Sequence, residues 1–221
     1  MGVAASVKID RHGPAGVLSE WEIELLFGDG FRTERDRALF GICLFAATRI
    51  AEACSLLRID VFDSLERTRP ALVVRKGNTK GQLDTRVIPM HPELRLLLLA
   101  YQPQLHPNNP YLFPGRHPAH HWKHITPDGA DRLLREACRR VKLEGFSTHS
   151  FRRTSLTEMS NQGIPLRVIQ KISGHRTLTQ LQRYLEVSDA QVKGAIASLS
   201  AFNCTGKAPK FGVEIETPVT P

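Results

Sequence analysis

The sequence predicts a mainly α-helical domain that contains one small antiparallel β-sheet, an α+β fold. Helix-start signals recur along the chain, in which Ser or Thr is followed three positions later by Glu or Gln. Between residues 71 and 89 the pattern changes to two short β-prone runs separated by turn-forming residues. With 221 residues, the chain is long enough for one full domain with its own core.

The first part of the chain predicts a lead-in followed by two helices. Residues 1–17 contain scattered Gly and Pro without apolar periodicity, which predicts a flexible segment. Ser19 and Glu22 form a capping box, and Gly28-Asp29-Gly30 is expected to stop the helix that follows. A longer helix is predicted to open near Thr33, and further helical turns to run to about Leu57. One face of the longer helix is apolar: Leu39, Phe40, Cys43, Leu44 and Ala47.

The middle of the chain predicts a β-hairpin with a basic tip. Ala71–Val74 and Thr85–Pro89 are the strand candidates, and Lys76–Gly81 is the turn between them. We expect a helix at about Pro92–Leu99, and then a loop rich in Pro and His from Gln102 to His124.

The remainder is predicted to be helical to about Leu199. Thr126-Pro127 begins one helix, because Pro in the first helical turn loses no hydrogen bond. Another runs from Pro165 to Gly174, a typical C-terminal stop. Capping boxes at Thr177 and Ser188 open two more amphipathic helices. We therefore expect a domain over residues 18–200 and a disordered tail over 201–221.

Composition favours a polyanionic partner. The net charge is +8 and the pI is about 9.6. No apolar run approaches the roughly 18 residues that span a bilayer, and the N-terminus lacks a secretory signal, so we expect a cytoplasmic protein. The cysteines lack any C-x-x-C pairing and are expected to be reduced thiols: Cys43, Cys54, Cys138 and Cys204.

Several side chains suit chemistry on a phosphodiester. His149 and Arg152 lie three residues apart at the start of a predicted helix, which places them on one face. A guanidinium can bind two phosphate oxygens at once. His175 follows Gly174 at a helix terminus, and Tyr184 comes nine residues later. Taken singly, each also suits a structural role: a capping histidine, a surface arginine or a packed tyrosine.

Their order and spacing carry a more specific signal. Thr148-His149-Ser150-Phe151-Arg152, Ser173-Gly174-His175 and Tyr184 resemble the second signature box of phage integrases and tyrosine recombinases. The first box of that family is a T-G-x-R-x-x-E motif about a hundred residues upstream, where this chain has Ala46-Ala47-Thr48-Arg49-Ile50-Ala51-Glu52. Ala47 replaces the usual glycine, which predicts a plainly helical backbone there.

The resemblance makes Arg49 the first phosphate-binding arginine and Glu52 the carboxylate that supports it. The alternative is an i,i+3 surface ion pair, worth a few tenths of a kcal/mol. Apolar neighbours on both sides favour burial instead. The family also places a catalytic lysine on a β-hairpin between the boxes. Lys80 fits best and Lys76 is the competitor, while either lysine could be merely solvated.

The resemblance implies a DNA strand transferase. Tyr184 would attack the scissile phosphate to give a 3′-phosphotyrosine, and His149 would accept its proton. Lys80 would protonate the leaving 5′ oxygen. The remaining groups would stabilise the charged phosphorane, namely Arg49, Arg152 and His175. No metal, cofactor or ATP is required.

Partner surfaces are expected on two helices. A basic stripe after Thr126 is either a solvated face or a set of phosphate contacts: Arg132, Arg135, Arg139 and Lys142. Lys76 is a further candidate for DNA contact. The helix at 188–199 packs on its own core or reaches into a neighbouring subunit, so we expect a homo-oligomer on double-stranded DNA. The four histidines in residues 117–124 lack a Cys or carboxylate that would complete a metal site.

Two other functions share these features: a non-catalytic DNA-binding protein on the same fold, and a type IB topoisomerase-like enzyme that rejoins the same strand. All the motif residues of the resemblance are present, which favours a site-specific recombinase or integrase of a mobile element, acting at the nucleoid. Members of the family usually carry an additional N-terminal DNA-binding domain.

Overall fold

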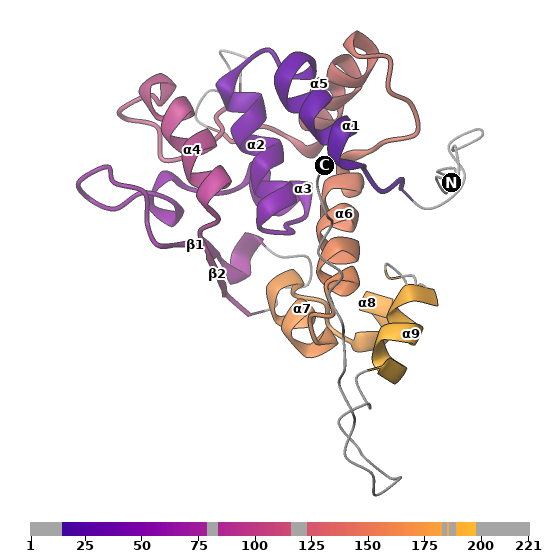
Figure 1. Ribbon diagram of the computed structural model, residues 1–221. Coiled ribbons are helices and arrows are strands. Elements are labelled where there is room, and N and C mark those ends of the chain that lie inside the picture. The colour runs from indigo at the N-terminus through magenta and orange to yellow at the C-terminus, as the bar shows by residue number, and fades with distance from the viewer. Residues whose placement is uncertain (1–14, 79–83, 116–122, 183–184, 186–188, 198–221) are drawn as a thin grey trace, which may run out of the picture. The chain divides into compact units, whose positions relative to one another are not determined.

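The fold is mainly helical with one two-stranded antiparallel sheet, as predicted (Figure 1). The computed structural model describes residues 15–78, 84–115, 123–182, 185 and 189–197. The chain divides into two compact units, with the boundary after Glu186. The first contains α1 to α8 and the sheet. The second contains α9 (Asp189–Ala197), in which Val192 and Ile196 are exposed.

The first helix begins at the capping residue that the sequence predicts. α1 (Glu20–Leu25) starts at the Ser19 capping box, where the Glu22 carboxylate accepts from Ser19 N–H at 2.8 Å. The helical backbone ends at Gly30, within the predicted stop Gly28-Asp29-Gly30, but its last turn over Leu26–Gly30 is π-helical, which the sequence did not predict. Since Leu26 is fully buried there, packing of that side chain stabilises a turn that glycine propensity opposes.

α2 (Glu34–Phe45) is the central helix. Thr33 caps it as predicted, with its Oγ1 accepting from Asp36 N–H at 3.1 Å. The expected single apolar face is wrong, because every residue from Ala38 to Leu44 is buried. A helix that is buried on all sides has no solvent-facing stripe to create a periodic pattern. A short helix, α3 (Ile50–Cys54), follows.

The hairpin consists of β1 (Ala71–Val74) and β2 (Arg86–Pro89), with Val74 opposite Arg86. In β2 the side chains of Arg86 and Ile88 are buried, whereas Val87 is exposed. α4 (Pro92–Tyr101) packs along α2 (Figure 1). Leu94 and Leu98 of α4 are buried there.

The second half consists of α5 (Pro127–Arg140), α6 (Thr148–Asn161), α7 (Leu166–Ser173) and α8 (Leu178–Gln182). Thr126 caps α5 through a 3.0 Å bond from Gly129 N–H, as predicted. Gly174 ends α7 in the left-handed conformation, also as predicted. The α7 end lies against β2, although these elements are far apart in sequence (Figure 1).

Two apolar clusters flank the middle of α6. The larger includes Phe151, whose ring packs near Phe31 and Phe40. The smaller is formed by Ala47, Leu156, Ile169 and Leu181. Arg152 therefore stands on α6 between residues of both cores. Among the described residues, no helix is long and apolar enough to cross a membrane.

Candidate active site

Arg152 is the most deeply buried cation of the described site residues, at 2% exposure. Its guanidinium donates to the carbonyl of Ala47 and to that of Ser173, the latter at 2.7 Å. It also lies 3.3 Å from Nε2 of His175. These contacts join the α2–α3 connection, α6 and the end of α7, so Arg152 has a fixed position and direction.

Ala47 corrects a sequence prediction. Its φ is +47°, so the backbone is left-handed and not plainly helical. The chain turns there between α2 and α3, and the Ala47 carbonyl accepts from Arg152. An L-residue in this conformation costs roughly 1–2 kcal/mol. The residue that replaces the family's usual glycine therefore keeps the conformation that glycine favours.

Arg49 and Glu52 form a partly buried pair at the start of α3. Arg49 is the residue before the helix, and its N–H and guanidinium Nη1 donate to the Glu52 carboxylate at 2.9 and 3.1 Å. The Glu52 side chain is 1% exposed, whereas that of Arg49 is 25% exposed. The alternative of a solvated surface pair is wrong for Glu52, and the guanidinium of Arg49 remains accessible to a ligand.

His175 is held in a neutral state. Burial, together with the neighbouring cations of Arg152, Arg49 and Arg86, lowers its pKa to about 3. Its Nδ1 lies 2.8 Å from the Ser173 hydroxyl. Because Arg152 only donates, its contact favours Nε2 as an acceptor, with Nδ1–H donating to Ser173. The hydroxyl of Ser173 can also donate to Nδ1, and Nε2 would then carry the proton.

The other predicted residues are placed as follows. His149 is exposed in the first turn of α6, three residues before Arg152. Lys76 is exposed in a 3₁₀ turn, and its N–H donates to Thr85 Oγ1 at 3.2 Å. Lys80 and Tyr184 lie outside the described residues. In the described part of the chain, no group of three His, Cys, Asp or Glu side chains suits a metal ion.

The sequence interpretation missed Arg86. This side chain is buried on β2 and donates to Glu52 Oε2 at 2.7 Å and to the Ile172 carbonyl at 2.8 Å. A signal for it existed, since Arg86 and Ile88 alternate with Thr85 and Val87 and so share the inward face of the strand. The guanidinium groups of Arg49 and Arg86 thus share one carboxylate, and that of Arg152 lies beside His175.

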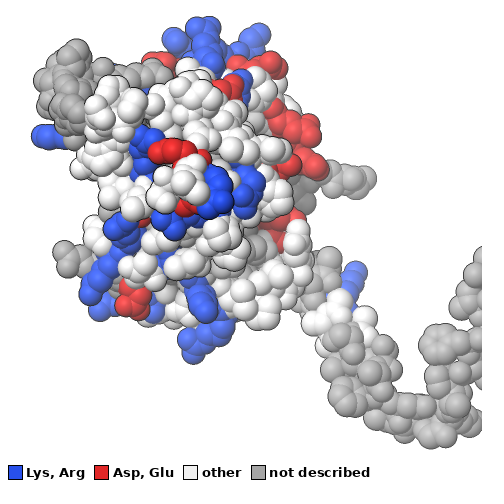
Figure 2. Space-filling view, turned by 90° about the vertical axis from the view of Figure 1, so that its left-hand side faces the viewer, with Lys and Arg blue, Asp and Glu red and all other residues white. Residues whose placement is uncertain are grey.

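Two guanidinium groups share one carboxylate and a third lies beside neutral His175, so the positive charges outnumber the negative one and favour the binding of an anion. Guanidinium groups bind phosphate oxygens in a directed, bidentate manner. Lys and Arg side chains are also spread over the face that carries α4 and the hairpin, with fewer acidic groups between them (Figure 2).

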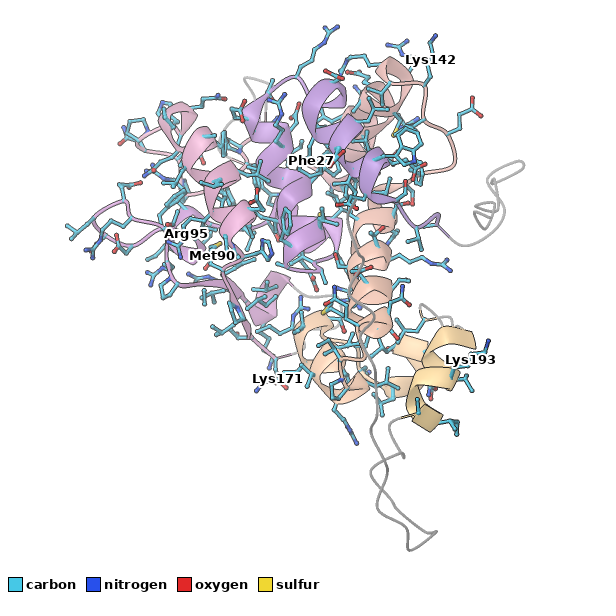
Figure 3. All side chains as sticks on the ribbon, viewed as in Figure 1. Phe27, Met90, Arg95, Lys142, Lys171 and Lys193 are labelled. Carbon is cyan, nitrogen blue, oxygen red and sulfur yellow. The ribbon has the colours of Figure 1, made fainter. Side chains whose placement is uncertain are left out.

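The basic stripe of α5 lies on the surface. Arg132, Arg135 and Arg139 are exposed, and Arg135 pairs with Asp131 at 3.0 Å. Lys142 follows the end of α5 at a φ of +55° and projects from the molecule (Figure 3). Opposite the stripe, Leu134, Ala137 and Cys138 are buried as expected.

The cysteines that the structure describes are free and buried: Cys43, Cys54 and Cys138. Burial raises the pKa of Cys43, that of Cys54 to about 12 and that of Cys138 to about 11. Their thiols therefore stay protonated and unreactive in the folded state.

The chain is similar in sequence to proteins named as tyrosine recombinases. A tyrosine recombinase of Thermosipho africanus is 27% identical over 186 residues, covering 82% of this chain and 61% of the relative. The tyrosine recombinase XerA of Pyrococcus horikoshii is 30% identical over 162 residues, covering 73% and 54%. The chain thus spans about half to three-fifths of the length of these relatives.

Solved structures share the fold. The crystal structure of XerA recombinase superposes with a TM-score of 0.68 at 22% identity, covering 86% of this chain and 66% of the other. The Tn1549 transposon integrase, solved with a circular intermediate DNA, gives 0.68 at 18% identity, covering 86% and 68%. Residues 20–191 match the phage integrase family. The chain therefore belongs to the phage integrase family.

Proposed function

We propose that this chain is the catalytic part of a site-specific DNA recombinase, which cuts and rejoins DNA through a 3′-phosphotyrosine. The buried contact of Arg152 with His175, beside the Arg49–Glu52 pair, carries the proposal. This arrangement presents fixed donors in a water-poor site, which is the most effective way to stabilise a developing phosphorane. The names of the relatives support the same activity.

Arg49 and Arg152 bind the non-bridging oxygens of the scissile phosphate. Because His175 is neutral, it adds a hydrogen bond without requiring a proton from solvent. Phosphate binding turns Ser173 O–H toward Nδ1, and Nε2–H of His175 then donates to an oxygen. A double-stranded DNA substrate supplies such a phosphate.

The covalent step uses Tyr184 as the nucleophile, His149 as the proton acceptor and a hairpin lysine as the acid. Oη of Tyr184 forms a bond to phosphorus as the bond from phosphorus to the 5′ oxygen breaks. The phenol proton passes to His149, and a hairpin lysine gives a proton to the 5′ oxygen. Lys80 is our first candidate for that acid and Lys76 the second. Attack by a 5′ hydroxyl reverses the step, so neither metal nor ATP is consumed.

DNA contacts outside the site come from the exposed cations of α5 and from Lys76. Two exposed apolar residues of α9, Val192 and Ile196, support a role of that helix in subunit exchange within an oligomer on DNA. Such a substrate places the protein in the cytoplasm at the nucleoid.

The test is covalent trapping. Nicked duplexes from the DNA flanking the gene are incubated with protein in EDTA, and SDS gels detect a protein–DNA band. We expect a band that Tyr184→Phe abolishes. A band that persists in Tyr184→Phe contradicts the assigned nucleophile. DNA binding without a band in the unaltered protein supports a non-catalytic role. Rejoining to a second duplex separates recombination from relaxation of the same strand.

The same assay identifies the acid. In a substrate with a 5′-bridging sulfur, the leaving thiolate needs no proton, so cleavage by a variant that lacks the acid is restored. We expect Lys80→Ala to be slow on ordinary DNA and rescued by sulfur, with Lys76→Ala as the matched variant. Rescue of Lys76→Ala alone would assign the role to Lys76.

A further inference from the structure

Arg86 connects two parts of the site that are distant in sequence. Its Nη2 donates to Glu52 Oε2, 34 positions away, at 2.7 Å. Its Nη1 donates to the carbonyl of Ile172, 86 positions away, at 2.8 Å. The residue is 8% exposed, so if either hydrogen bond were lost, water could not readily take its place and a buried polar group would stay unpaired.

Each anchor of Arg86 leads to a proposed phosphate ligand. The carboxylate that it binds is the one that receives the N–H and the guanidinium of Arg49. The carbonyl that it binds belongs to the last turn of α7, directly before Ser173, Gly174 and His175. One planar guanidinium therefore fixes the distance between the Arg49 side and the His175 side of the site.

The Arg86 side chain packs tightly against Gly174. A Cβ at this position would lie 2.8 Å from Cδ and 2.9 Å from Nε and Nη1 of Arg86. The end of an arginine is ordinarily flexible, but here both terminal nitrogens, Nη1 and Nη2, are hydrogen-bonded, so the side chain cannot easily move aside. Gly174 is thus required for its φ of +66° and, in addition, for the space that Arg86 occupies.

We propose that Arg86 is a positioning residue for strand cleavage: by binding Glu52 and the end of α7 together, it aligns Arg49 and His175 on one phosphate. It does not touch the substrate. This inference rests on the proposed function, because its main measurement is the rate of cleavage.

Arg86→Gln tests the proposal, with Arg35→Gln as the matched control. Arg35 is equally buried, at 8% exposure, and donates to Pro114 O outside the site. We expect Arg86→Gln to slow single-turnover cleavage by about 100-fold at saturating DNA, with little change in DNA affinity, because misplaced reacting groups lose rate before binding. Arg35→Gln, compared at equal fractions folded, keeps its rate. Equal losses in the two variants would overturn the proposal.

A double-variant cycle with Glu52→Gln separates positioning from general stability. If Arg86 acts through Glu52, Arg86→Gln slows Glu52→Gln much less than it slows the unaltered protein. Rate losses that multiply in full would show that Arg86 does not act through this carboxylate.

Two measurements do not depend on activity. An NMR titration of His175 in the free protein should show its pKa rising in Arg86→Gln, because a neighbouring cation is removed. Gly174→Ala should destabilise the unaltered protein more than it destabilises Arg86→Ala, where the space is vacant. If the unaltered protein forms no covalent complex, the proposed function fails, while these two results still test the placement of Arg86. An unchanged pKa and equal Gly174→Ala penalties would overturn it.

Discussion

The buried arginines of the site and the exposed arginines of α5 carry the same charge under opposite conditions. Arg86 and Arg152 are 8% and 2% exposed and are each bonded to groups on other elements. Arg132 and Arg139 project into solvent. Burial of a guanidinium costs desolvation free energy, and the hydrogen bonds that offset this cost fix its direction. An exposed guanidinium can change its conformation, and salt screens its charge. The first set suits stabilisation of a transition state, and the second suits attraction of a polyanion.

The largest difference should appear when arginine is replaced by lysine. Arg152→Lys keeps the charge but loses the forked donors to Ala47, Ser173 and His175, so we expect cleavage to fall by about 10²–10³-fold. Arg139→Lys is the matched change on α5 and should leave the rate nearly unaltered. Single-turnover trapping on nicked DNA measures both. Similar rates in the two variants would remove the distinction between the sets.

The backbone at Ala47, which accepts a hydrogen bond from Arg152, should not tolerate a larger side chain. Ala47→Val places a β-branched residue at a φ of +47° in a site that is 1% exposed, which should destabilise the protein by about 2–4 kcal/mol. Ala51→Val, at an exposed position of α3, should cost less than about 1 kcal/mol. Urea unfolding measures both, and equal costs would show that the connection between α2 and α3 is not constrained.

The exposed set should affect binding and its salt dependence. Arg139→Gln should lower the slope of log Kd against log salt by about one and leave cleavage at saturating DNA unchanged. Arg135→Gln should change the slope less, because Arg135 already pairs with Asp131. Fluorescence anisotropy at several salt concentrations gives the slopes. An unaltered slope in Arg139→Gln would mean that DNA does not approach this face of α5.

The smallest effect concerns pH. The pKa of His175 is lowered to about 3 in the folded protein, against 6.5 for an unperturbed histidine. Below pH 6.5 the unfolded chain binds a proton that the folded protein excludes, so stability is lost as the pH falls toward 3. His175→Gln should therefore lose less stability than the unaltered protein between pH 7 and pH 5. Urea midpoints at both values test this, and parallel losses would contradict it.

Much of the fold was predictable because its signals are local. The Thr33 and Thr126 caps, the β1 run and the Gly174 terminus each depend on residues within about four positions of one another. The Arg49–Glu52 pair was predictable for the same reason, and its apolar neighbours indicated burial. The roles of Lys80 and Tyr184 remain predictions from the motif, since both residues lie outside the described part of the chain.

The positions of most helices and of the hairpin, the basic charge and the order of the motif residues could be read from the chain without its structure. Three features depended on folding: the left-handed backbone of Ala47, the π-helical turn over Leu26–Gly30, and the position of Arg86 between Glu52 and Ile172. Local propensity disfavours the first two, and packing against distant residues overrides it. The third joins residues that are far apart in the chain, and no spacing in the sequence encodes their distance in space.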